Sequence, residues 1–174
     1  VVAMMLLAWR GSGRSDGASH PAVGQRLAFA ELLPLTGEAK SIAAKQLQGK
    51  VTLINFWGPW CDNCLLEMPH LVRLREKFAD RSDVQFVFVS CSPDWEPDTP
   101  PALRWREDRA KLRWSTEKLL AQRGWNIPTH YDPCGFTRQA FPGLDAWAGY
   151  PTTLLVDQGG VIRYVMIGYN SGDE

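Results

Sequence analysis

Apolar residues along the first half of the chain follow first a strand pattern, then a helix pattern, then a strand pattern again. Residues 51–57 are rich in β-branched and aromatic side chains, and Gly58 and Pro59 end this run. Between 61 and 79 the apolar residues recur at helical spacing with charged residues between them. Residues 84–90 form a second strand-like run. The pattern predicts a strand, a helix and a strand in that order.

The second half of the chain ends in a predicted β-hairpin. Residues 154–157 and 161–166 are strand-like, and Gln-Gly-Gly at 158–160 separates them as a turn. We also expect a short strand near 130–131 and a short hairpin region over 25–50. Because strands and helices alternate, the order of elements implies an α/β sandwich.

The segment 93–125 interrupts this alternation. Prolines break its first half, from Asp94 to Pro101, whereas 102–123 reads as one or two helices rich in Arg and Trp. We therefore expect a helical insertion. This insertion has two alternative roles, packing against the sheet or docking of a partner protein.

Length and charge limit the classes of protein to consider. The chain has 174 residues and is 45% hydrophobic, which is enough for one domain with a full core. It carries 19 basic and 19 acidic residues, a balance that argues against a nucleic-acid groove. We expect a monomer that needs no cofactor.

The first 20 residues differ in character from the rest. Val1 to Trp9 is apolar but far short of the roughly 20 residues that a membrane span needs. We interpret it as the remnant of a signal peptide or membrane anchor, and Arg10 to His20 as a flexible tether. A start-site artefact is the alternative. The folded domain is expected over 21–174.

Two cysteines mark the start of the predicted helix. Cys61 and Cys64 lie one turn apart, so a disulfide between them closes a small ring on one helix face. Free N–H groups and the positive end of the helix dipole stabilise a thiolate there. We expect Cys61, nearer the solvent, to attack disulfides and Cys64 to resolve the mixed disulfide. Half of a zinc site is the alternative, but a second Cys-x-x-Cys or a close Cys/His pair is missing, and no metal is expected.

A proline motif precedes the terminal hairpin. Tyr-Pro-Thr-Thr occupies 150–153, and a proline at the mouth of a strand often follows a cis bond. Together with Asn-Phe-Trp-Gly-Pro-Trp-Cys-Asp-Asn-Cys-Leu-Leu-Glu-Met-Pro at 55–69, it resembles the thioredoxin superfamily, and within it the TlpA/ResA-like extracytoplasmic thiol–disulfide oxidoreductases. The similarity covers about residues 21–168. It implies a thioredoxin-like fold with a central mixed sheet flanked by helices, although the C-terminal helix usual in such folds is not evident.

The resemblance also implies roles for single residues. Pro151 corresponds to the cis-proline that packs against the disulfide, with an ordinary trans proline as the alternative. Tyr150 offers its backbone to an extended substrate segment, and Trp60 is expected beside it in substrate binding. Glu67 matches a carboxylate that exchanges a proton with Cys64, and a solvated helix residue is the alternative. Thioredoxins use a buried aspartate where this chain has Asn55, which cannot titrate.

Two further cysteines are expected to pair. Cys91 follows the strand 84–90, and Cys134 follows the short strand expected beside it. A disulfide closing such a long loop contributes about 4 kcal/mol in the chain-entropy model. Two free, buried thiols are the alternative.

Three functions compete. The first, implied by the resemblance, is a thiol–disulfide oxidoreductase that acts on protein substrates, as a reductant outside the cytoplasm, in cytochrome c maturation or copper-site assembly, with an upstream redox partner and a possible membrane anchor. The second is a peroxiredoxin-like peroxidase, which relies on a Thr two or three residues before its cysteine, where this chain has Gly58 to Trp60. The third is a copper-binding module, for which His70 lies far along the helix.

The sequence does not determine the direction of electron flow. The negative charge of Asp62 opposes formation of the Cys61 thiolate, whereas the helix dipole favours it.

Overall fold

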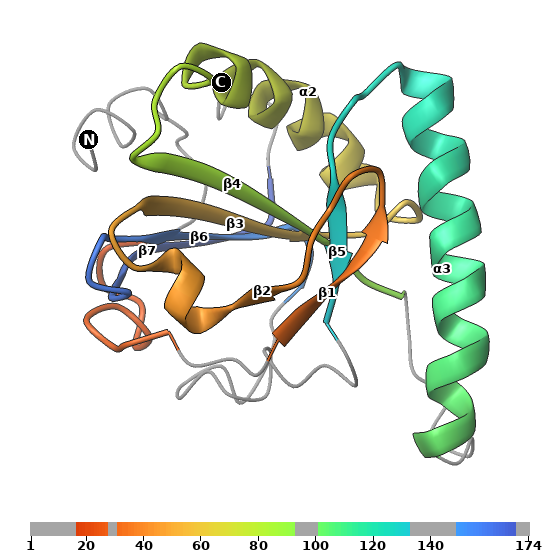
Figure 1. Ribbon diagram of the computed structural model, residues 1–174, viewed down its shortest axis with the longest axis horizontal. Helices are drawn as coiled ribbons and strands as arrows, with labels where there is room; N and C mark the ends of the chain where they lie inside the picture. The colour runs from red at the N-terminus through yellow and green to blue at the C-terminus, as the bar shows by residue number, and fades with distance from the viewer. Residues whose placement is uncertain (1–16, 28–30, 93–100, 133–148, 170–174) are drawn as a thin grey trace.

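A mixed β-sheet forms the centre of the protein (Figure 1). The computed structural model describes residues 17–27, 31–92, 101–132 and 149–169. The sheet has seven strands in the order β2-β1-β5-β4-β3-β6-β7. The elements are β1 (Glu31–Thr36), β2 (Ile42–Ala43), the 3-10 helix η1 (Ala44–Leu47), β3 (Val51–Trp57), α2 (Asp62–Lys77), β4 (Val84–Ser90), α3 (Pro101–Arg123), β5 (Thr129–Tyr131), β6 (Thr152–Val156) and β7 (Ile162–Ile167).

Strand β3 lies near the middle of the sheet and is buried along its whole length. It pairs in parallel with β4, where Trp57 is opposite Ser90, and antiparallel with β6, where Asn55 is opposite Thr153. A central strand is covered on both faces, which explains its nearly continuous run of apolar residues. The predicted strands 51–57 and 84–90 and the terminal hairpin are confirmed.

The period of two along each strand divides the core between the faces of the sheet. On one face, Ile54 and Phe56 pack with Leu154 of β6. On the other face, Leu53 and Trp57 pack with apolar residues of α2 and α3. Asn55 has the same parity as Leu53 and Trp57, so its side chain points toward α2.

The described part of the insertion, from residue 101 onward, is a single long helix, α3, followed by the short strand β5 (Figure 1). The short strand expected near 130–131, beside the strand 84–90, is confirmed. Strand β5 runs parallel to β4, with Val89 opposite His130. Leu120 of α3 packs in the same core cluster as Cys61 and Cys64. A buried hydroxyl pair, Ser90 with Thr116 at 2.9 Å, also joins α3 to β4. The inner face of the insertion is therefore part of the core beside the cysteines.

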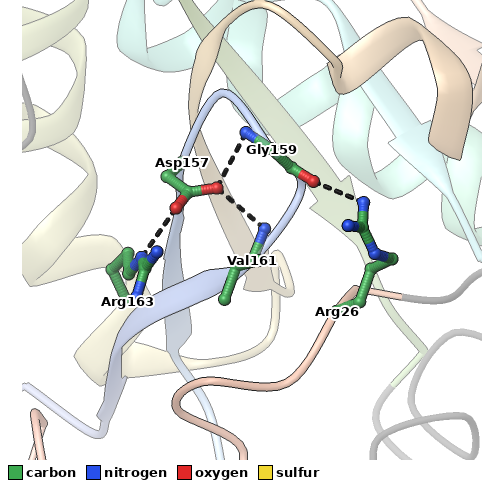
Figure 2. Close-up of polar contacts among 5 residues, drawn as sticks. All are labelled: Arg26, Asp157, Gly159, Val161 and Arg163. Carbon is green, nitrogen blue, oxygen red and sulfur yellow. Dashed lines mark hydrogen bonds and ion pairs between the residues drawn. The ribbon is translucent and has the colours of Figure 1, made fainter.

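Residues 17–27 run along the edge of the sheet beside β7. Backbone hydrogen bonds join Gly24 to Ile162 and Leu27 to Gly160, each at 2.8 Å. At the turn between β6 and β7, Arg26 donates to the carbonyl of Gly159 at 2.6 Å (Figure 2). None of the helices in these described parts of the chain has the length and apolar character needed to cross a membrane.

Candidate active site

The two motif cysteines lie where β3 gives way to α2. Cys61 is the N-cap of α2 and Cys64 is in its first turn. Their sulfur atoms form a disulfide, with the two Cα atoms 5.2 Å apart. A pair one helical turn apart can thus be bridged without a change of fold. The predicted redox pair is present in its oxidised form.

The two sulfurs have unequal surroundings. Cys61 is 7% exposed, whereas Cys64 is fully buried at 0%. The backbone N–H of Cys64 donates to the Cys61 sulfur at 3.2 Å. A helix N-terminal N–H aimed at sulfur stabilises negative charge there, as a thiolate requires. Accessibility and hydrogen bonding both favour Cys61 as the nucleophile.

The loop before Cys61 is attached to the end of β4. Cys91 donates its backbone N–H to the Trp57 carbonyl at 2.7 Å, and its own carbonyl accepts from the indole of Trp60 at 2.8 Å. A Cβ at Gly58 would collide with that indole and lie 2.9 Å from the Cys91 oxygen. Only glycine leaves room for this close approach. The roles of Gly58 and the Cys91 backbone were not anticipated from the sequence, in which only the strand-ending property of Gly58 was visible.

Pro151 and Tyr150 reach the same place from the start of β6, which pairs with β3 at the edge opposite β4. The Tyr150–Pro151 bond is cis, as predicted. The ring of Tyr150 packs against the core cluster that contains Cys61 and Cys64. It also meets the ring of Trp60 edge-to-face, with centroids 5.3 Å apart. Trp60 is 40% exposed, so an apolar surface borders the more accessible cysteine.

Glu67 lies inside the protein, one helical turn after Cys64. It is 1% exposed, so its alternative interpretation as a solvated residue is wrong. Asn55 donates from Nδ2 to Oε2 of Glu67 at 2.9 Å, and the hydroxyl of Thr153 donates to Oε1 at 3.3 Å. Asn55 also donates to Thr153 Oγ1 at 2.8 Å. The sequence singled out Glu67 and Asn55 but gave no role to Thr153, which only strand pairing brings opposite Asn55.

The structure describes only one cysteine of the second expected disulfide. Cys91 is buried, and its thiol lies 3.7 Å from the carbonyl of Val89. Cys134 lies outside the described residues, so the Cys91–Cys134 pairing stays a prediction. The adjacency of β4 and β5 on which it was based is present.

The site offers a dithiol pair, a buried carboxyl group and an apolar rim. Within the described ranges no group of three or more His, Cys, Asp and Glu side chains converges as metal ligands would. Of the histidines, His70 stacks on Tyr169 with ring centroids 5.8 Å apart. His130 is a core residue whose pKa is lowered by burial, against the raising effect of the Lys40 and Phe88 carbonyls. The chemistry that these groups support is thiol–disulfide exchange.

Comparisons with known proteins agree with this chemistry. Residues 23–165 match the family model described as the AhpC/TSA family. Over 137 residues the chain is 43% identical to the thiol-disulfide oxidoreductase ResA of Bacillus thuringiensis (strain Al Hakam), covering 79% of this chain and 66% of that protein. It thus spans about two thirds of that relative's length. It is also 24% identical over 147 residues to the thiol:disulfide interchange protein DsbE of Pseudomonas aeruginosa, covering 84% of this chain and 67% of the relative.

A solved structure shares the fold. The crystal structure of a secreted thiol-disulfide isomerase from Corynebacterium glutamicum superposes with a TM-score of 0.62 at 20% identity. The superposition covers 84% of this chain and 78% of that one. The predicted thioredoxin-like arrangement of sheet and helices is confirmed.

Proposed function

Because the chain belongs to the AhpC/TSA family of thioredoxin-like proteins and carries the Cys-x-x-Cys pair of a thiol–disulfide oxidoreductase, we propose that it reduces disulfides in protein substrates. The observation that carries this proposal is the unequal pair of sulfurs. Cys61 is the more exposed and receives a helix N-terminal hydrogen bond, whereas Cys64 is buried behind it.

The reaction is a two-step exchange. The thiolate of reduced Cys61 attacks a substrate disulfide, so a bond forms from Cys61 to one substrate sulfur while the other leaves as a thiolate and is protonated by solvent. Cys64, once deprotonated, attacks Cys61, which forms the Cys61–Cys64 disulfide and releases the second substrate thiol. Two electrons pass from the protein dithiol to the substrate. An upstream redox partner must then reduce the pair again.

Glu67 is the proposed proton acceptor for Cys64. Both groups are buried on the same face of α2, one turn apart. A thiol with no access to water needs a nearby base before it can attack, and Glu67 is the carboxyl group that the fold places there. Asn55 takes the place of the aspartate used by thioredoxins proper and does not titrate.

Substrate is proposed to bind along the apolar rim. Trp60 and Tyr150 present an edge-to-face aromatic pair next to Cys61. An extended segment of a substrate protein can lie there and pair with the backbone of Tyr150, beside Pro151. Rings of this kind supply contact area at low conformational cost.

We place this reaction outside the cytoplasm. The relatives named ResA and DsbE are thiol–disulfide proteins, and a reductant is needed where disulfides form spontaneously. Cytochrome c maturation and copper-site assembly are the processes we propose, and the apolar residues 1–9 are proposed to derive from a signal peptide or membrane anchor. A measurement of the reduction potential of the Cys61–Cys64 couple against glutathione tests the direction of electron flow.

Cysteine variants test the proposed roles. We expect Cys61→Ser to abolish reduction of a disulfide-bonded protein such as insulin. Cys64→Ser should instead accumulate a mixed disulfide between Cys61 and substrate, visible by mass spectrometry. Normal turnover by Cys64→Ser would refute the assignment.

A peroxide-consumption assay separates this function from that of a peroxidase. Peroxiredoxin-like peroxidases rely on a threonine two or three residues before their cysteine, whereas Gly58 to Trp60 occupies that stretch in this chain. We expect no peroxide consumption beyond that of a free thiol. Fast peroxide turnover that depends on Cys61 alone would favour the peroxidase.

A further inference from the structure

The carboxyl group of Glu67 is surrounded by hydrogen-bond donors. Both N–H groups of the Asn55 amide are used, one on Glu67 Oε2 and one on Thr153 Oγ1. The Thr153 hydroxyl in turn donates a hydrogen bond to Glu67 Oε1 at 3.3 Å. A carboxylate only accepts hydrogen bonds, so this arrangement matches ionised Glu67. Hydrogen bonds to the charged form stabilise that form and offset the cost of its burial.

One atom in this network has no hydrogen-bond partner among the residues that the structure describes. The carbonyl oxygen Oδ1 of Asn55 is buried and accepts no hydrogen bond from the part of the chain that the structure describes. Leaving a buried carbonyl unsatisfied costs free energy. Asn55 itself is 0% exposed and sits in the central strand, beneath the helix that bears Cys64. The unmatched oxygen is therefore a feature of the active-site core and calls for an explanation.

If Glu67 is protonated, Oδ1 of Asn55 can accept a hydrogen bond from the carboxyl group. A proton on Oε2 would point at the Nδ2–H of Asn55. The carboxyl O–H and the amide N–H are both donors, so they would repel each other. Rotation of the amide by half a turn about its last side-chain bond removes the conflict, because Oδ1 then accepts the carboxyl proton where Nδ2 donated before. The amide nitrogen moves to the place that Oδ1 has left. The Thr153 hydroxyl, which accepted from Nδ2 before, then turns to donate to Oδ1 instead of Glu67 Oε1. The asparagine thus has one orientation for each protonation state of Glu67.

We propose that Asn55 and Thr153 are positioning residues that set the protonation of Glu67, with Asn55 turning its amide as Glu67 gains or loses a proton. This inference rests on the proposed function of Glu67 as the base for Cys64. In the first orientation Glu67 is held ionised and takes the proton from the Cys64 thiol. In the second, Asn55 accepts a hydrogen bond from the protonated carboxyl group while the Cys64 thiolate attacks Cys61.

The disulfide keeps the two cysteine thiols out of a titration of Glu67. The groups around Glu67 include the uncharged side chains of Asn55 from β3 and Thr153 from β6, and Cys64 lies one turn before it on the same helix. In the oxidised protein Cys61 and Cys64 are joined and do not titrate. A titration of the oxidised form therefore reports Glu67 without the thiols.

The test follows two signals in the oxidised full chain across pH. Difference infrared spectroscopy follows the Glu67 carboxyl stretch, which is identified by its loss in Glu67→Gln. Nuclear magnetic resonance follows the side-chain amide of Asn55. We expect both signals to change with the same midpoint, since the amide turns when the carboxyl group is protonated. An Asn55 amide signal that stays constant through the Glu67 titration would overturn the proposal.

Variants separate a positioning role from a merely structural one. Thr153→Val removes one donor to the carboxylate, so we expect the midpoint to rise by about one pH unit. Thr153→Ser keeps the hydroxyl and should restore the original midpoint. Asn55→Asp places a second carboxyl group beside Glu67, so the two should share a proton and titrate in two separated steps.

A buried threonine elsewhere serves as the matched control. Thr36 forms a hydroxyl pair with Thr129 at 2.6 Å on β1, away from β3 and β6 in the sheet. Thr36→Val should leave the midpoint unchanged. If Thr153→Val also leaves it unchanged, the proposal is wrong even when disulfide reduction proceeds. Absence of disulfide reduction in the wild type would refute the proposed function instead, and the two failures are distinct.

Discussion

The two ends of strand β6 each hold a carboxylate in several hydrogen bonds, but in opposite surroundings. Near its start, Glu67 is buried and accepts from uncharged Asn55 and Thr153. Directly after its end, Asp157 lies in the turn to β7, with a side chain 19% exposed, and accepts from the guanidinium of Arg163 at 2.6 Å. It also accepts from the backbone N–H groups of Gly159 and Val161 (Figure 2).

The nature of the partners separates the two roles. Desolvation raises the pKa of Asp157, but the Val161 amide, Arg163 and the Gly159 amide together lower it below the ordinary value. A carboxylate fixed by a cation and two amides stays ionised and shapes a turn. Glu67 accepts from the uncharged side chains of Asn55 and Thr153 and lies one turn from buried Cys64, which supports the proposal that it exchanges a proton. The charge of these hydrogen-bond partners distinguishes the structural Asp157 from the proposed proton acceptor.

The largest expected effect is on catalysis. Glu67→Gln keeps the shape of the side chain but cannot take a proton, so we expect resolution of the mixed disulfide to slow about 100-fold. Stopped-flow measurement of substrate release at neutral pH gives the rate. Asp157→Asn is the matched control at the other end of β6 and should react like the wild type. Equal losses of rate in the two variants would contradict the different roles of Glu67 and Asp157.

A smaller effect is expected on stability, at the opposite end of the strand. Asp157→Ala removes the acceptor of two backbone N–H groups and of Arg163, which should lower the free energy of unfolding by about 1 kcal/mol after allowance for the solvent exposure of the pair. Urea unfolding measures it. Asp80→Ala, at an exposed carboxylate after α2, should cost nothing measurable. The rate of thiol–disulfide exchange catalysed by Asp157→Ala should match that of the wild type.

The smallest effect concerns pH. Because the pKa of Asp157 is lowered by folding, its contribution to stability is present above its unfolded value of 3.8 and is lost as the pH falls through the folded value. We expect the difference in unfolding free energy between wild type and Asp157→Asn to shrink below about pH 4. Asp83, whose pKa Arg81 lowers, acts in the same direction in both proteins and cancels from the difference. A difference that is constant from pH 7 to pH 3 would argue against this role of Asp157.

Local sequence predicted much of the fold. The runs 51–57 and 84–90 are strands with those bounds, and the helix expected over 61–79 is α2, Asp62–Lys77. Periodicity and turn residues act over a few neighbours, which explains this agreement. The cis bond before Pro151 was also predicted, from a motif of four residues.

The sequence by itself also determined the faces on which the reactive residues lie. Side chains alternate along strand β3, so Asn55 lies on the same face as Leu53 and Trp57, toward α2. Along α2, residues three or four apart share a face, so Glu67 lies on the face of Cys64. Only the tertiary structure decided that Thr153 completes the network and that the Cys91 carbonyl receives the Trp60 indole. These contacts join residues far apart in the chain, and their geometry depends on strand order and register. Those are set by the packing of the whole sheet, which no local pattern encodes.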